Sequence, residues 1–358
     1  MSEDRKIPVA ALNCDELTQV FSLPQSFRAK QIFKWISSGA ETFEQMTTLS
    51  KDLRKQLSEK AVIYSSKVTK QLYDSDGTIK LQIETYDRNF IESVLLTDKA
   101  ERKTACVSCQ VGCAMGCEFC KTGTLGFARN LADYEIVEQF LYLEKEIRKT
   151  NPNGKLDNIV FMGMGEPMLN LDNIRKAISI LSDKEGRNLS TRRITISTCG
   201  IIKGIYDLAD NGPCVRLAVS LTTADSALRA QLMPVTKTNS LPELKKAIQY
   251  FTKKTKKRCT LEAALIGKMN TGEYSIKNMI NFARGLDVHI NLIPWNKVEG
   301  LDFEEPTKSE CEKFFHAIEK AGLNVTFRTK RGQEIGGACG QLGAVKKVMG
   351  TSKNLKQR

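Results

Sequence analysis

Cysteine is the residue with the most distinctive chemistry in this chain, because five of its eleven cysteines fall within one stretch of fifteen residues. Three of the five, Cys113, Cys117 and Cys120, have the spacing Cys-x3-Cys-x2-Cys in the sequence CAMGCEFC. A glycine-containing loop with this spacing can bring three thiolates to one iron-sulfur cluster, which leaves one iron open because such clusters normally take four cysteines. An open position is typical of a catalytic metal site. A zinc site with Cys106 or Cys109 as fourth ligand fits the same spacing and remains an alternative.

Further polar residues and glycines follow the strands that the sequence predicts. In the turn MGMGEPMLN, two glycines allow a ligand to approach the backbone closely, and the glutamate can accept a hydrogen bond from an amine. Taken singly, each such residue is an ordinary turn or cap residue. Ligands of parallel sheets bind at the carboxyl ends of strands, so together these residues outline one ligand site. They are Gly163, Gly165, Glu166, Ser197, Ser220 and Asn296.

The elements that must position these residues alternate between strand and helix patterns. Amphipathic segments such as DYEIVEQFLYLEKEI and NLDNIRKAISIL separate the strand-like runs. This alternation predicts parallel strands joined by crossover helices, an α/β fold in the form of an open sheet or barrel. The predicted strands are 104–110, 158–165, 192–198, 215–222, 259–266, 288–295 and 324–330.

The N-terminal part has a different pattern. Residues 14–60 have helical apolar spacing, and residues 62–97 have the alternation of antiparallel strands with the turn DSDG between them. We therefore expect an N-terminal helical accessory domain, a β-rich connecting segment, a core domain and a basic C-terminal tail, at 1–62, 63–102, 103–345 and 346–358.

The composition points to a folded protein with a polyanionic partner. The chain has 41% hydrophobic and 27% charged residues, and a net charge of +13 from 54 Lys and Arg against 41 Asp and Glu. Basic residues also gather at 253–258, at 326–332 and in the tail, which favours RNA or DNA. We find neither a signal peptide nor a membrane-spanning run, and many free cysteines suit a reducing compartment, so we expect a cytoplasmic protein.

Six motifs in order along the chain carry a resemblance to a known family. CVSCQVGCAMGCEFC, GFARNL, FMGMGEP, RRITISTCG, NLIPWN and ACGQL resemble the RlmN/Cfr family of radical S-adenosylmethionine (SAM) methyltransferases of rRNA and tRNA adenine. The N-terminal stretches FRAKQIFKWI and SDGTIK look like those of the RlmN branch. The resemblance implies a radical SAM partial (β/α)6 barrel with an RNA-binding N-terminal domain.

The resemblance also implies a role for each motif cysteine. Cys113, Cys117 and Cys120 would hold a [4Fe-4S] cluster whose open iron binds SAM. Cys339 matches the cysteine that takes a methyl group from a first SAM, and a second SAM would supply the radical that activates this S-methyl group. Cys106 matches the thiol that resolves the covalent RNA adduct by forming a disulfide with Cys339.

Other positions carry over as substrate and cofactor contacts. Glu92 matches a carboxylate that handles a proton of the substrate. In place of the frequent SLHA, this chain has SLTT, so Thr222 replaces a histidine, and Cys109 stands where serine is usual. The SAM contacts would be Gly165, Glu166, Ser197, Ser220, Leu221, Thr222 and Asn296. The remaining cysteines, which match no motif, are expected to be packing residues.

The sequence thus predicts an RNA methyltransferase that forms 2-methyladenosine in the peptidyl-transferase region of 23S rRNA, and in tRNA next to the anticodon. An unidentified electron donor, a disulfide reductant and a monomeric state complete the expectation. Three alternatives remain open: the resistance-type enzyme that methylates carbon 8, a zinc-stabilised RNA-binding protein without catalytic activity, and a radical enzyme acting on a small molecule. Iron and sulfide, as opposed to zinc, would separate the enzyme from the zinc protein.

Overall fold

The computed structural model of the protein describes residues 6–343. The predicted basic tail at 346–358 lies outside the described residues. Within that described range, no helix is long and apolar enough to cross a membrane.

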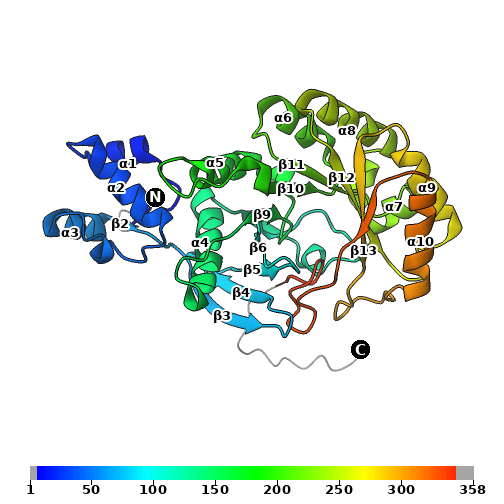
Figure 1. Ribbon diagram of the computed structural model, residues 1–358, viewed down its shortest axis with the longest axis horizontal. Helices are drawn as coiled ribbons and strands as arrows, with labels where there is room; N and C mark the ends of the chain where they lie inside the picture. The colour runs from blue at the N-terminus through cyan, green and yellow to red at the C-terminus, as the bar shows by residue number, and fades with distance from the viewer. Residues whose placement is uncertain (1–5, 344–358) are drawn as a thin grey trace, which may run out of the picture.

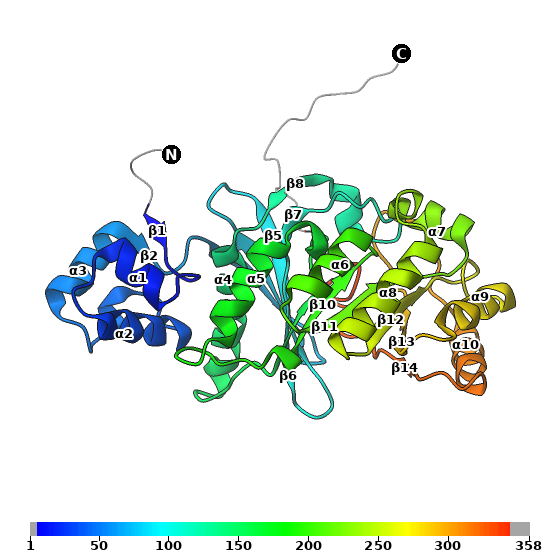
Figure 2. The same ribbon diagram turned by 90° about the horizontal axis from the view of Figure 1, so that it is seen from above.

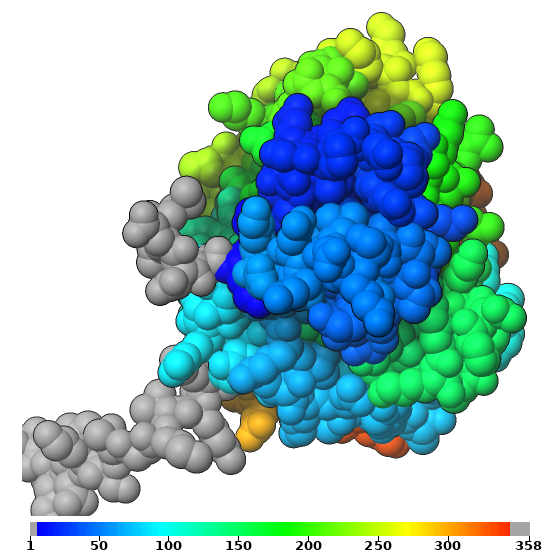
Figure 3. Space-filling view, turned by 90° about the vertical axis from the view of Figure 1, so that its left-hand side faces the viewer, coloured from blue at the N-terminus to red at the C-terminus, as the bar shows by residue number. Residues whose placement is uncertain are grey.

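A small helical unit forms the N-terminal end of the molecule. It contains helices α1 (Cys14–Phe21), α2 (Ser26–Ser37) and α3 (Lys51–Lys60), with the short strands β1 (Ile7–Pro8) and β2 (Ala61–Val62) paired in parallel. The buried positions of α2 recur every three or four residues, which gives the helix one apolar face. Figure 3 views the molecule from this side and shows the unit, in blue, stacked against the rest of the protein.

The remainder of the described chain is organised around one ten-stranded sheet. Within this sheet, β6 (Lys103–Cys106) and the strands from β9 (Asn158–Phe161) to β14 (Val325–Phe327) pair in parallel, whereas β3 (Lys67–Tyr73) to β6 pair antiparallel. The predicted antiparallel strands of the connecting segment therefore extend the sheet of the core. In spatial order, the strands are β14 (Val325–Phe327), β13 (Val288–Pro294), β12 (Cys259–Leu265), β11 (Arg216–Ser220), β10 (Ile194–Thr198), β9 (Asn158–Phe161), β6 (Lys103–Cys106), β5 (Phe90–Thr97), β4 (Ile79–Glu84) and β3 (Lys67–Tyr73).

Helices cover the outside of this curved sheet, which confirms the predicted α/β partial barrel (Figures 1 and 2). The central strands are buried on both faces, as expected for parallel strands under crossover helices. The helices are α4 (Asp133–Thr150), α5 (Leu171–Ser182), α6 (Ile202–Asn211), α7 (Ser226–Leu232), α8 (Leu241–Thr255), α9 (Glu273–Ala283) and α10 (Lys308–Lys320).

Two segments close the inner side of the barrel. The hairpin of β7 (Gln110–Gly112) and β8 (Phe127–Asn130) encloses the cysteine loop that follows Gly112. The C-terminal segment, orange to red in Figure 1, returns from β14 toward β4 and β5. Its end is bonded there, because the Gly343 N–H donates to the Glu92 carboxylate at 2.8 Å.

Candidate active site

Two adjoining cavities lie at the carboxyl ends of the parallel strands. The larger has about 820 Å³ of space between its walls, its open mouth included, and the smaller about 560 Å³ on the same basis. Met162, Cys339 and Leu342 line both cavities. Cys339, predicted to be a methyl carrier, therefore stands at the border between them.

The predicted cluster ligands Cys113, Cys117 and Cys120 all line the larger cavity. A compact loop places them there: the Cys113 N–H donates to the Gly126 carbonyl at 2.7 Å, and the Cys120 N–H donates to the Cys117 carbonyl at 3.1 Å. A side chain at Gly123 would come within 2.6 Å of the Cys117 carbonyl oxygen. Glycine is thus required for the turn that brings the three thiols together.

The larger cavity suits an iron-sulfur cluster better than a zinc ion. Burial raises the pKa of the Cys113 thiol to about 12, and iron binding would overcome this by taking the thiolate form. The three thiols of the cysteine loop line this cavity, and three is the number of ligands that a cluster with one open iron takes. The fourth zinc ligand considered above is also misplaced, because Cys106 lines only the smaller cavity and the buried Cys109 is in the lining of neither.

Glu166 is held rigidly at the wall of the larger cavity. Its carboxylate accepts hydrogen bonds from the N–H groups of Met168 at 3.0 Å and Cys199 at 2.8 Å, and its own N–H donates to Gln110 at 2.9 Å. Gly165, at φ +104°, packs so closely that a Cβ atom would lie 2.5 Å from Gln110. Burial raises the pKa of the Glu166 carboxyl group. The site provides a fixed acceptor for a cation such as an ammonium group.

The ends of β10 and β11 contribute the next predicted contacts. Ser197 and Ser220 line the larger cavity. Of the two cavities described, neither is lined by Leu221 or Thr222. Thr222, which replaces the usual histidine, is buried in a left-handed conformation at φ +61°, and its N–H donates to the Glu262 carbonyl at 3.0 Å. Thr222 is therefore connected to the site through its backbone and not through its side chain.

A fully buried arginine fixes these strand ends. The Arg229 guanidinium donates to the carbonyls of Cys199 at 2.7 Å, Leu221 at 3.0 Å and Ser220 at 3.3 Å, and to the Thr236 hydroxyl at 2.7 Å. These acceptors are neutral, and burial lowers the pKa of the guanidinium. Arg229 ties the carboxyl end of β10 to that of β11 beside the larger cavity.

The smaller cavity holds the two predicted reactive thiols. Cys106, at the end of β6, and Cys339 both line it, together with Asn296 and Arg328. Desolvation raises the pKa of the Cys106 thiol to about 12 and that of the Cys339 thiol to about 11, although the Cys339 residue as a whole is exposed, while the Arg328 guanidinium acts in the opposite direction on both. Asn296 donates to the Cys339 carbonyl at 3.3 Å. Asn296 therefore contacts the backbone of Cys339 from the wall of the smaller cavity.

Sequence reasoning missed two charged residues of the site. Glu262, buried on β12, lies 3.5 Å from the Ser197 hydroxyl and 3.8 Å from the Arg328 guanidinium. It is the one acidic residue of the apolar run CTLEAALI, a signal that could have identified it, because an isolated buried charge requires partners. Arg328 follows β14 within a basic run and had no such signal.

Two further residues occupy places that their predicted roles did not specify. Cys199, expected to be a packing residue, lines the larger cavity beside Glu166. The Glu92 carboxylate pairs with Lys80 at 3.1 Å and accepts the Gly343 N–H at 2.8 Å, and it is in the lining of neither described cavity. Glu92 therefore contacts the segment that carries Cys339.

Comparisons with known proteins agree with this geometry. Residues 107–277 match the radical SAM superfamily, and residues 11–63 match the ribosomal RNA large subunit methyltransferase N-terminal domain. A probable dual-specificity RNA methyltransferase RlmN of Treponema denticola is 58% identical over 339 residues, 95% of this chain and 96% of its own length. That of Treponema pallidum is 53% identical over 92% of this chain and 95% of its own. This chain belongs to the RlmN family.

A solved structure supports the fold of this RlmN family member over almost its entire length. The radical SAM methyltransferase of Sphaerobacter thermophilus superposes with a TM-score of 0.90 at 36% identity, covering 94% of this chain and 99% of the other. The protein is thus a radical SAM RNA methyltransferase, with a [4Fe-4S] cluster and SAM as the cofactors that its family uses. The three thiols on the larger cavity are the residues that fit the cluster.

Proposed function

We propose that this enzyme forms 2-methyladenosine in the peptidyl-transferase region of 23S rRNA, and in tRNA next to the anticodon. The observation that carries the proposal is the position of Cys339, which borders the cysteine-lined larger cavity and also the smaller cavity that contains Cys106. One sulfur at this border can take a methyl group on one side and deliver it to RNA on the other. The net charge of +13 suits a polyanionic substrate.

Different residues of the larger cavity would hold the cluster and SAM. Cys113, Cys117 and Cys120 would hold the cluster, while Glu166, Ser197 and Ser220 line the same cavity and would contact SAM. When bound, the cluster would supply an electron and SAM a 5'-deoxyadenosyl radical, which can take a hydrogen atom from an S-methyl group, so that the adenine carbon need not act as a nucleophile.

The two thiols of the smaller cavity would carry the methyl group and release the product. Cys339, as a thiolate, takes the methyl group of a first SAM and leaves S-adenosylhomocysteine. After a hydrogen atom is lost from this S-methyl group, its carbon joins the adenine ring. The Cys106 thiolate then attacks the Cys339 sulfur, so that a disulfide forms and the sulfur-carbon bond breaks with its electron pair on carbon. That carbon takes a proton to become the methyl group, the ring position loses its proton, and the unpaired electron left by the addition returns to an acceptor, for which the oxidised cluster would serve.

Several finer assignments belong to the same proposal. The route uses two SAM molecules in each cycle, and the disulfide needs a reductant and the cluster an electron donor. Proton handling by Glu92 requires the segment near Gly343 to move, because both carboxylate oxygens are engaged in the described arrangement. We expect a monomer that acts in the cytoplasm.

Anaerobic reconstitution with iron and sulfide, followed by SAM, a reductant and unmodified rRNA and tRNA fragments, tests the proposal. Nucleoside mass spectrometry is expected to find 2-methyladenosine together with 5'-deoxyadenosine, and the RNA that carries it is the substrate. The product 8-methyladenosine would instead show that the enzyme methylates carbon 8 of the adenine. Absence of both products with an intact cluster would contradict the proposal.

A resolving-thiol variant tests the order of steps. Cys106→Ala is expected to accumulate a covalent complex of protein and RNA, because addition proceeds while release does not. The exposed Cys214 provides the control variant Cys214→Ala, which should release its product as the natural enzyme does. Release of methylated RNA by Cys106→Ala would remove Cys106 from the mechanism.

A further inference from the structure

The loop that carries Cys339, residues 332–343, is held in place by distant parts of the chain. On its C-terminal side, the Thr122 hydroxyl donates to the Leu342 carbonyl at 2.6 Å and the Lys121 N–H donates to the Gly340 carbonyl at 2.8 Å. The loop contains several glycines, which favour many backbone conformations over one. We call it the Cys339 loop.

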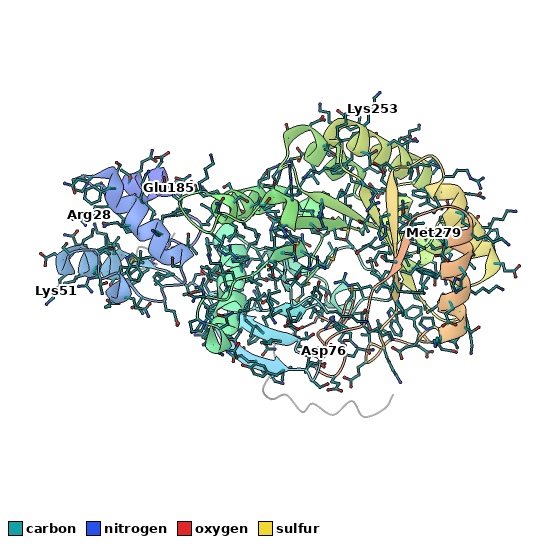
Figure 4. The ribbon with its side chains drawn as sticks, in the orientation of Figure 1. Arg28, Lys51, Asp76, Glu185, Lys253 and Met279 are labelled. Carbon is teal, nitrogen blue, oxygen red and sulfur yellow. The ribbon has the colours of Figure 1, made fainter. Side chains whose placement is uncertain are left out.

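Its N-terminal side is bonded by the turn of the β3–β4 hairpin, more than 250 residues earlier in the sequence. Asp76 Oδ2 accepts the Gly332 N–H at 2.9 Å, and Asp74 Oδ2 accepts the Glu334 N–H at 3.1 Å. Asp76 is labelled in Figure 4, where it lies next to the C-terminal segment coloured red in Figure 1. Partial burial acts to raise the pKa of Asp76, but its hydrogen bonds, including the one from the Gly332 N–H, hold the pKa below its ordinary value.

Each aspartate uses its two oxygens for different purposes. Asp74 Oδ1 accepts the Asp76 N–H at 3.1 Å, and Asp76 Oδ1 accepts the Thr78 N–H at 2.9 Å, so these oxygens close the hairpin turn. The Oδ2 atoms remain for the Cys339 loop. Turn closure by itself needs only one acceptor, which asparagine also supplies. The second acceptor is what a carboxylate adds at these positions.

The same strands bond the loop again on either side of Cys339. Lys80, on β4, donates to the Gly336 carbonyl at 3.1 Å and pairs with Glu92 at 3.1 Å. Glu92 in turn accepts the Gly343 N–H at 2.8 Å. The antiparallel strands before the barrel therefore bond the Cys339 loop at four backbone positions, 332, 334, 336 and 343.

We propose that Asp74 and Asp76 are positioning residues that hold the Cys339 loop where its thiol borders both cavities. The role of the loop in catalysis rests on the proposed function, whereas the hydrogen bonds to the loop do not depend on it. A glycine-rich loop freed at its N-terminal side samples more conformations, so that Cys339 spends less time near Cys106. The effective concentration of the two thiols toward each other then falls.

The variant Asp74→Asn/Asp76→Asn tests this with little risk to the fold, because one amide oxygen can still close each turn while the second acceptor is lost. Asp98→Asn is the matched control. Asp98 closes the turn between β5 and β6 by accepting the N–H groups of Ala100 and Arg102, and it bonds only within that turn in the described structure.

Gly332→Ala perturbs the same contact from the side of the loop. Gly332 has φ +67°, and a Cβ atom there would lie 2.8 Å from the Thr78 methyl group. The substitution should push the loop away from the hairpin while the hairpin sequence stays natural. If Gly332→Ala and the double variant change the same measured values in the same direction, the change arises from the lost contact between loop and hairpin and not from misfolding of the turn.

Two measurements on the full-length protein with its cluster decide the question. Hydrogen exchange at Gly332 and Glu334 should become about tenfold faster in the double variant, because two amides lose their acceptors. The equilibrium constant for the Cys106–Cys339 disulfide against glutathione, mapped by peptide mass spectrometry, should fall by about threefold or more. Asp98→Asn should leave both values as in the natural protein.

Unchanged hydrogen exchange at Gly332 and Glu334 in the double variant would refute the two hydrogen bonds from the aspartates. Faster exchange with an unchanged disulfide equilibrium would refute the positioning role, because the loop would then hold Cys339 in place without the hairpin. Neither measurement uses RNA. Failure of the proposed function would appear as a missing methylated nucleoside in the natural enzyme, and it is therefore distinguishable from failure of this inference.

Discussion

Replacing Arg229 by methionine tests the idea that one buried guanidinium fixes the cofactor edge of the sheet. The side chain makes three hydrogen bonds of 3.0 Å or shorter, to Leu221, Thr236 and Cys199. Methionine fills much of the same space and satisfies none of these acceptors. The variant therefore separates the hydrogen bonds of the guanidinium from its bulk.

The expected loss follows from those bonds. At about 1 kcal/mol each, a low value for bonds to a charged group, the three amount to about 3 kcal/mol. Removing a buried charge recovers part of this, so we expect the free energy of unfolding to fall by about 2 to 3 kcal/mol. At about 2 °C per kcal/mol in a large domain, the Tm should fall by roughly 4 to 6 °C.

Thermal unfolding followed by circular dichroism, with parallel SAM titrations, measures both consequences. SAM affinity should also fall, because the carbonyl groups of Cys199 and Ser220 lose the group that fixes them beside the cavity. The control is Arg216→Met, at the exposed opposite end of β11. A Tm within about 1 °C of the natural protein would refute the reasoning, since three buried acceptors would then have lost their donor at no cost.

Three other perturbations have definite expected outcomes. Arg328→Gln should slow alkylation of Cys339 several-fold at pH 9, because the thiol pKa of about 11 rises further without the cation; equal rates in a pH profile would contradict this. Gly165→Ala should abolish SAM binding in calorimetry, because its Cβ would lie 2.5 Å from Gln110 at φ +104°; natural affinity would disprove the packing argument. Burial raises the pKa of Glu138 to about 7, so the folded state binds a proton more tightly than the unfolded state and stability should fall as pH rises from about 4.5 to 7. Glu138→Gln should flatten that fall in denaturant titrations, and an unchanged slope would rule out Glu138 as its source.

Local sequence was sufficient to predict the cysteine loop and the strands that lead to the site. The spacing of Cys113, Cys117 and Cys120 brings the thiols together within one short loop, so few distant contacts are needed. The βα alternation predicted the parallel order because crossover connections leave few other arrangements. The sequence pattern therefore predicted the three thiols of the larger cavity and several of its polar residues, but less than half of its lining.

Contacts between distant parts of the chain could not be predicted in this way. Arg328 and Glu262 are 66 positions apart in the numbering, and Arg229 bonds backbone carbonyls, which have no sequence signature. Asn296 was expected beside SAM, yet the fold places it on the smaller cavity against the Cys339 carbonyl. Side-chain direction at a strand end depends on how the sheet curves, and curvature arises from packing of the whole barrel.

The sequence by itself predicted which groups would do the chemistry: three clustered thiols, two reactive cysteines and a basic surface for RNA. Only the tertiary structure decided that Cys339 borders both cavities and that Asp74 and Asp76 bond its loop. The physical reason is the range of the interactions. Spacing and periodicity describe neighbours along the chain, whereas the position of a glycine-rich loop is set by hydrogen bonds to strands that lie more than 250 residues away.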